Sequence, residues 1–108
     1  MLYLQKVNYE EIFLNLDARV MQLKIYYELS EYEVLEAFLQ SFRMFLIRQR
    51  KRLVYHYEVY KNIIHFVQAL MRLPTLSKSQ INRLRQKITA TPTLTEREWL
   101  LEKIEKPK

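Results

Sequence analysis

The sequence predicts an all-α protein of about five helices, arranged as antiparallel helical hairpins. None of the 108 residues is glycine and only three are proline, whereas a chain of this length usually carries about seven glycines. Glycine supplies the positive-φ corners on which β-hairpins and phosphate loops depend. In addition, apolar residues recur every three or four positions, which is the spacing of amphipathic helices. Helices joined by short polar turns are therefore the architecture that remains.

The first hairpin is expected over about 9–49. Asn8 and Glu11 have the spacing of a capping box, which predicts a helix that begins near Tyr9. One apolar stripe of this helix comprises Ile12, Leu16, Val20, Leu23 and Tyr27. A second apolar set lies on other sides of it and comprises Phe13, Met21, Ile25 and Tyr26. A helix that is apolar on several faces is typical of packing between neighbours.

A second helix is expected to complete this hairpin. The period breaks near Ser30, and apolar spacing resumes at Tyr32 and continues to Leu46. The basic run RQRKR over 48–52 obscures the end of this helix.

The second hairpin is expected over about 53–90. Its first helix should run from Leu53 to Leu73 and stop before Pro74, because proline cannot donate the backbone hydrogen bond that a helix needs. Ser77 and Gln80 have the spacing of another capping box and predict a short helix after the turn.

A terminal helix is expected over about 95–105. Thr95 and Glu98 repeat the capping-box spacing, and Trp99, Leu100 and Ile104 follow as its apolar positions. The whole chain, 1–108, is predicted to form one helical domain, because its length is that of one small domain.

The stretch LKIYYELSEYEVLEAFLQSF over 23–42 resembles a tetratricopeptide repeat. Tyr26 and Tyr27 fall where that family often has aromatic residues, and Ser30 begins a turn similar to its glycine-acid-tyrosine turn. The resemblance implies antiparallel helical hairpins with right-handed stacking. Leu35 and Phe42 stand where the family has small residues, which implies a wider helix crossing. The longer pattern from Asn15 to Ile104 is similar to the C-terminal portion of large bacterial helical-repeat proteins, and this implies a role in protein contacts.

Charge is unevenly distributed along the chain. Residues 1–42 contain three basic and seven acidic groups, a net of −4, whereas residues 43–92 contain eleven basic groups and one acid, a net of +10. A basic patch over 43–92, with Arg48, Arg50, Lys51 and Arg52 at its centre, favours phosphate backbones, and neighbouring aromatic rings can stack on bases. A nucleic-acid-binding domain is therefore the alternative function. The other explanation is that arginines at a helix C-terminus interact with the helix dipole.

The sequence gives little support for catalysis or metal binding. It has no cysteine. His56 and His65 are nine residues apart, so they point about 180° away from each other on one helix. No metal-ligand spacing, nucleophile motif or cofactor fingerprint is present. We therefore expect no enzyme activity, no cofactor and no metal.

No membrane segment is expected, because charged or amide residues interrupt every apolar stretch before it could cross a bilayer. The first residues, MLYLQKVNYEE, do not have the form of a signal peptide. Together with the lack of cysteine, this favours a cytoplasmic location.

The expected function is a protein–protein interaction or scaffold module, and we expect the chain to be the C-terminal part of a longer helical-repeat protein. Eight tyrosines, five phenylalanines and one tryptophan supply aromatic surface of the kind that interfaces use. Phe13, Met21 and Tyr26 are the candidate interaction residues. The partner is expected to be another protein, preceding helical repeats or a second copy of the chain.

Overall fold

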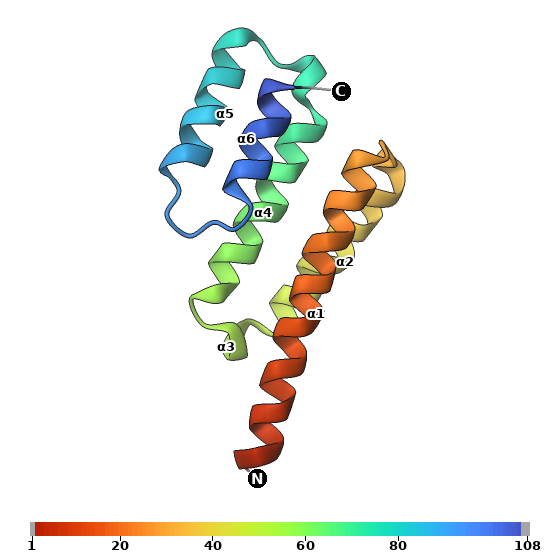
Figure 1. Ribbon diagram of the computed structural model, residues 1–108, viewed down its shortest axis with the longest axis vertical. Helices are drawn as coiled ribbons and strands as arrows, with labels where there is room; N and C mark the ends of the chain where they lie inside the picture. Colours follow the sequence, from red (N-terminus) through yellow and green to blue (C-terminus); the bar gives the residue numbers. More distant parts are fainter. Residues whose placement is uncertain (1, 107–108) are drawn as a thin grey trace. The chain divides into compact units, whose positions relative to one another are not determined.

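All regular structure in the described part of the chain is helical. The computed structural model describes the backbone of residues 2–106 and the side chains of residues 10–106. Within these residues there are six α-helices, one 3-10 helix and no strand (Figure 1). The prediction of an all-α fold with about five helices is confirmed. Contacts divide the chain into two units, Met1–Phe45 and Leu46–Lys108. The single domain over 1–108 and the right-handed stacking of hairpins stay predictions.

The first unit contains α1 (Leu2–Glu28) and most of α2 (Tyr32–Arg48), which form a helical hairpin. The ring of Tyr26, near the end of α1, lies 5.5 Å from that of Phe38 in α2. The Arg19 guanidinium, two turns earlier in α1, lies 4.3 Å from the ring of Phe45, further along α2. Earlier residues of α1 thus meet later residues of α2, so the two helices are antiparallel.

Every residue of the predicted apolar stripe of α1 is buried. The buried side chains of the first unit are Ile12, Leu16, Val20, Leu23 and Tyr27 from α1, and Leu35, Leu39 and Phe42 from α2. The predicted start of the first helix near Tyr9 was wrong, because α1 already begins at Leu2. No proline or glycine interrupts the chain before Tyr9, so the Asn8–Glu11 spacing falls inside a continuous helix.

The turn between α1 and α2 ends the first helix with a Schellman motif. The Glu31 amide donates to the Tyr26 carbonyl and the Ser30 amide donates to the Tyr27 carbonyl, both at 3.0 Å. Ser30 has a φ of 58°, the left-handed conformation that this motif requires and that glycine usually adopts. A serine therefore makes the turn at the position where the tetratricopeptide pattern has glycine.

The second unit contains α3 (Arg50–Leu53), α4 (His56–Met71), η1 (Leu73–Thr75), α5 (Lys78–Ala90) and α6 (Arg97–Glu105). The helix expected from Leu53 to Leu73 is interrupted, because Val54 has a φ of 52° and a ψ of −123°. The helix after this break ends just before the 3-10 turn that contains Pro74, as the proline predicted.

The terminal helix is a central element of the second unit. α6 packs against both α4 and α5 and lies between them (Figure 1). Leu100 is fully buried and Ile104 nearly so. The Nε of Arg85 in α5 lies 2.9 Å from the Oε1 of Glu105 in α6, an ion pair that joins the two helices.

Side-chain hydrogen bonds hold the connector between α5 and α6. The Asn62 side chain, from α4, donates to the Thr93 carbonyl at 2.9 Å and to the Thr93 hydroxyl at 3.1 Å. The Arg97 guanidinium donates to the carbonyl of Ile88 at 3.2 Å and also to that of Thr91. Arg97 thereby satisfies carbonyls at the C-terminal end of α5.

The two capping boxes predicted for the second unit have different outcomes. Ser77 and Gln80 form both hydrogen bonds of a capping box at the start of α5, at 2.8 and 3.1 Å, and this prediction is confirmed. The prediction for Thr95 and Glu98 was wrong. α6 begins one residue later, after Glu96, which has a φ of 62° and whose side chain makes no capping hydrogen bond. The Arg97 contacts with α5 fix the chain at this point instead.

Candidate interaction surfaces

The outward side of α1 carries exposed apolar side chains. Leu14 is 69 % exposed, Met21 66 % and Ile25 52 %. Ala18, which lies between them on the helix, is also exposed. At 100° per residue these four residues fall within about 60° of one another around the helix. We call Leu14, Ala18, Met21 and Ile25 the outer stripe of α1.

The outer stripe lies opposite the core of the hairpin. The five buried residues of α1, from Ile12 to Tyr27, fall within about 80° of one another, and their mean direction is about 180° from that of the outer stripe. α1 is therefore apolar on two opposite sides, of which one packs in the hairpin core and the other is exposed. An exposed apolar patch of this kind typically marks a contact with a partner.

Only one of the three predicted interaction residues belongs to this surface. Met21 lies in the outer stripe, whereas Phe13 and Tyr26 are half-buried. Tyr26 packs edge-on against Phe38. The three residues point in directions that differ by about 80° to 140° around the helix, so they do not share one face. The repeating 4-3-4 spacing from Leu14 to Ile25 is the sequence pattern that would have identified the stripe.

The predicted basic patch lies at the start of the second unit. Arg48, Arg50, Lys51 and Arg52 are all exposed. The Arg50 guanidinium lies 4.9 Å from the ring centroid of Tyr57, a cation–π contact. All four cations precede the break at Val54 and therefore lie before the start of α4.

Two aromatic rings follow the basic patch directly. Tyr55 is 65 % exposed, and its ring centroid lies 4.1 Å from that of His56 at the first turn of α4. Both rings are within five residues of Arg52 in the sequence. The exposed cations are thus close in the sequence to the accessible ring of Tyr55.

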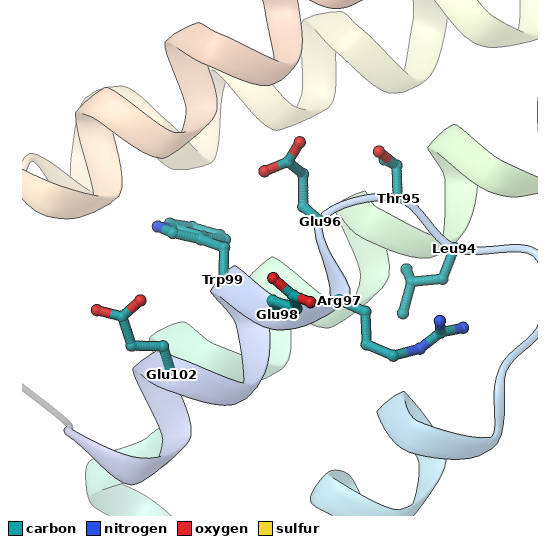
Figure 2. Close-up of a pocket in the computed structure, with 7 residues that line it drawn as sticks. All are labelled: Leu94, Thr95, Glu96, Arg97, Glu98, Trp99 and Glu102. Atoms are coloured by element: carbon teal, nitrogen blue, oxygen red, sulfur yellow. The ribbon is translucent and has the colours of Figure 1, made fainter.

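A pocket of about 650 Å³ lies at the start of α6. Figure 2 shows the residues that line it: Leu94, Thr95, Glu96, Arg97, Glu98, Trp99 and Glu102. Its indole and carboxylates would favour a cationic group. The Arg97 side chain is turned away toward α5, where it donates to backbone carbonyls (Figure 2). Over residues 10–106, no group of three or more histidine, aspartate or glutamate side chains is arranged to hold a metal ion.

The two histidines do not form a site together. The ring of His56 lies 4.1 Å from that of Tyr55 at a tilt of 32°, and the ring of His65 lies 5.4 Å from that of Phe66. Both belong to α4, on which they are nine residues apart.

None of the helices that the structure describes is long and apolar enough to cross a membrane.

No family model, curated protein or solved structure matches the chain. The resemblance of residues 23–42 to a tetratricopeptide repeat therefore stays a prediction.

Proposed function

We propose that the chain is a protein–protein interaction or scaffold module whose docking surface is the outer stripe of α1. The observation that supports this most directly is the exposure of Leu14, Met21 and Ile25, each more than half accessible on one side of a single helix. Such side chains contribute up to about 2 kcal/mol each when a partner removes them from water.

The opposite side of α1 explains why this helix would already be ordered before a partner binds. The buried stripe anchors the helix in the hairpin, and the Schellman turn at Ser30 fixes where the helix ends. A partner would therefore bind a preorganised helix and would not have to order it, which lowers the entropic cost of association. The binding mode would be that of helix-on-helix recognition, with anchors three and four residues apart.

We further propose that the hairpin is tetratricopeptide-like and that the chain acts as the C-terminal part of a longer helical array. Helical repeats stack by burying one face of each hairpin against the next. A hairpin with a second apolar face has the surface that such stacking requires. Preceding repeats, a second copy of the chain and an unrelated protein are thus the candidate occupants of the outer stripe.

Photo-crosslinking tests this proposal. A photoreactive phenylalanine analogue is placed at Met21, and the matched control carries it at Gln86, an exposed polar position on α5. After irradiation in cells that express the full chain, we expect covalent adducts from position 21 and few from position 86. Absence of any adduct at position 21, with the chain folded by circular dichroism, would contradict the proposal.

A second candidate function is nucleic-acid binding by residues 43–92. It is favoured by the exposed Arg48, Lys51 and Arg52, which are followed in the sequence by the neighbouring rings of Tyr55 and His56. In this mode the cations would contact phosphates, and the exposed tyrosine ring would stack on a base.

The cytoplasm is the compartment that we propose for either function.

Titration of labelled single-stranded RNA and duplex DNA at low and moderate salt tests the second candidate. Binding should weaken steeply as salt rises, because each phosphate contact releases a counterion. Arg48→Ala with Lys51→Ala should flatten the salt dependence, whereas Tyr55→Ala should weaken single-strand binding at every salt concentration. A lack of binding at low salt excludes this function.

A further inference from the structure

We infer that the occupant of the outer stripe is the outer stripe of a second copy, packed antiparallel to the first. This rests on the proposed function, in which the stripe is a docking surface. The argument comes from the spacing of the stripe, the size of its side chains and the charges on its flanks.

The spacing is that of a coiled-coil seam. Leu14, Ala18, Met21 and Ile25 are separated by four, three and four residues, which is the alternation of the two core positions of a heptad. In an antiparallel pair centred between Ala18 and Met21, each Ala18 faces Met21 of the other copy. Each Leu14 likewise faces Ile25. The smallest side chain of the stripe thus lies against its longest one, which lets the two helices pack closely.

The charges beside the stripe are complementary to themselves in this register. Asp17 and Lys24 lie on the same flank of the stripe, seven residues apart, at equivalent heptad positions. When two copies run antiparallel about the same centre, Asp17 of each faces Lys24 of the other. Two symmetry-related ion pairs result. The opposite flank carries the amides of Asn15 and Gln22, which face each other across the same axis; the Oδ1 of Asn15 accepts a hydrogen bond from the Nε of Arg19 in its own chain at 2.6 Å.

Other arrangements lack this match. In a parallel pair, Asp17 faces Gln22 and Lys24 faces Leu29, so no ion pair forms. An antiparallel pair shifted by one heptad toward the C-terminal end brings Lys24 against Lys24. A shift in the other direction brings Asp17 against Asp17. Charge therefore selects both the antiparallel orientation and this register.

The seam is bounded by like charges. In the same register Glu11, one step before the stripe, faces Glu28, one step after it, at both ends of the pair. These carboxylates limit the seam to the four layers of the outer stripe. The dimer should accordingly be weak and dependent on concentration, in the class of small, transient interfaces.

The test is a charge exchange in the full chain, measured by sedimentation over a range of protein concentrations. The wild-type chain should show reversible dimerisation. Asp17→Lys places lysine against lysine twice, and Lys24→Asp places aspartate against aspartate twice. Each substitution should raise the dimer Kd by about tenfold or more, since two attractive pairs become repulsive.

Two further experiments should restore dimerisation only if Asp17 of one copy pairs with Lys24 of the other. A mixture of the Asp17→Lys and Lys24→Asp chains should form heterodimers, because every lysine then faces an aspartate of the other chain. The double variant, Asp17→Lys with Lys24→Asp, should dimerise with a Kd within about threefold of wild type. In addition, Glu11→Lys should lower the Kd, since it replaces the repulsion with Glu28 by an attraction. Circular dichroism of each variant establishes that the helices are intact.

A second probe uses the absence of native cysteine. Ala18→Cys with Met21→Cys in one chain should give a disulfide-linked dimer, whereas Ala18→Cys alone should give little, because Ala18 does not face itself in an antiparallel pair. Efficient linkage of the single Ala18→Cys chain would overturn the antiparallel register.

A wild-type chain that stays monomeric at all concentrations overturns the self-association. If position 21 still crosslinks to another protein in that case, the proposed interaction function stands and only the identity of its partner was wrong. If position 21 gives no adduct at all, both proposals fail.

Discussion

The amide of Glu31 donates to the carbonyl of Tyr26 at 3.0 Å, closing the turn that joins α1 to α2. This bond spans Ser30, whose φ of 58° puts a residue with a Cβ atom in the left-handed region. The left-handed conformation costs about 1 kcal/mol or more in a residue other than glycine. The same turn that aligns the two helices of the first unit is therefore strained.

Ser30→Gly is expected to stabilise the chain by about 1 kcal/mol, because glycine adopts this conformation without the Cβ penalty. Chemical denaturation followed by far-ultraviolet circular dichroism measures the change. Ser30→Val provides the matched control and should destabilise the chain, since a β-branched residue tolerates positive φ poorly. Equal stability of the glycine and valine variants would contradict this account of the turn.

Val54→Gly is expected to stabilise the chain by about 1–3 kcal/mol. Val54 combines a φ of 52° with a ψ of −123°, a backbone conformation that is sparsely populated for residues with a Cβ atom. Its side chain is 70 % exposed, so its removal costs little buried surface. Val54→Ala keeps a Cβ atom and should change the free energy of unfolding far less. A destabilised glycine variant would show that the strain is not released at this position.

Asn62→Ala is expected to destabilise the second unit by about 1–2 kcal/mol, because it removes a half-buried amide that bonds both the carbonyl and the hydroxyl of Thr93. Thr93→Ala removes only the hydroxyl and should cost less. Fluorescence of Trp99, the only tryptophan, follows unfolding of this unit directly. A larger loss from Thr93→Ala than from Asn62→Ala would be inconsistent with these contacts.

Alkaline titration should show that Tyr27 ionises late. Burial, together with the neighbouring Tyr32 and Glu28, raises the pKa of Tyr27 from 10.0 to about 12. Between these pH values the folded chain holds a proton that the unfolded chain has lost, so stability falls as pH rises through this window. The contribution is fully present below pH 10 and is lost by about pH 12.

Tyrosinate absorbance measures this titration, and Tyr27→Phe is the matched variant. It should reduce the late component of the absorbance curve by the amplitude of one tyrosine and lessen the decline in stability between pH 10 and 12. Tyr55→Phe is the control, because Tyr55 is exposed and its loss should leave the late component in place. A late component of unchanged amplitude in Tyr27→Phe would assign the raised pKa to another residue.

The sequence was sufficient to predict those structural features that depend on residues close together in the chain. The apolar stripe from Ile12 to Tyr27 is buried as its spacing predicts. The capping box of Ser77 and Gln80 forms because both partners belong to the same turn. The predicted spacing of Thr95 and Glu98 is just as good, yet α6 begins elsewhere, because Arg97 is bound to carbonyls of α5. Local capping energies of about 1 kcal/mol are overridden by such tertiary contacts.

The candidate site was predictable only in part. Met21 was identified from its apolar character on a helix with several apolar faces. Phe13 and Tyr26 were chosen by the same criterion but are half-buried, since the sequence does not state which faces the neighbouring helix covers. The exposure of Leu14, Met21 and Ile25, and the burial of the opposite side of α1, are visible only in the tertiary structure.

The sequence by itself determined that this protein is helical and where most of its helices lie. Periodicity and the lack of glycine act on each segment independently of the rest of the chain. Only the tertiary structure decided that the helix after Leu53 breaks at Val54, that α6 lies between α4 and α5, and that one apolar face of α1 is exposed. These features depend on contacts between residues distant in sequence, and no local pattern encodes those contacts.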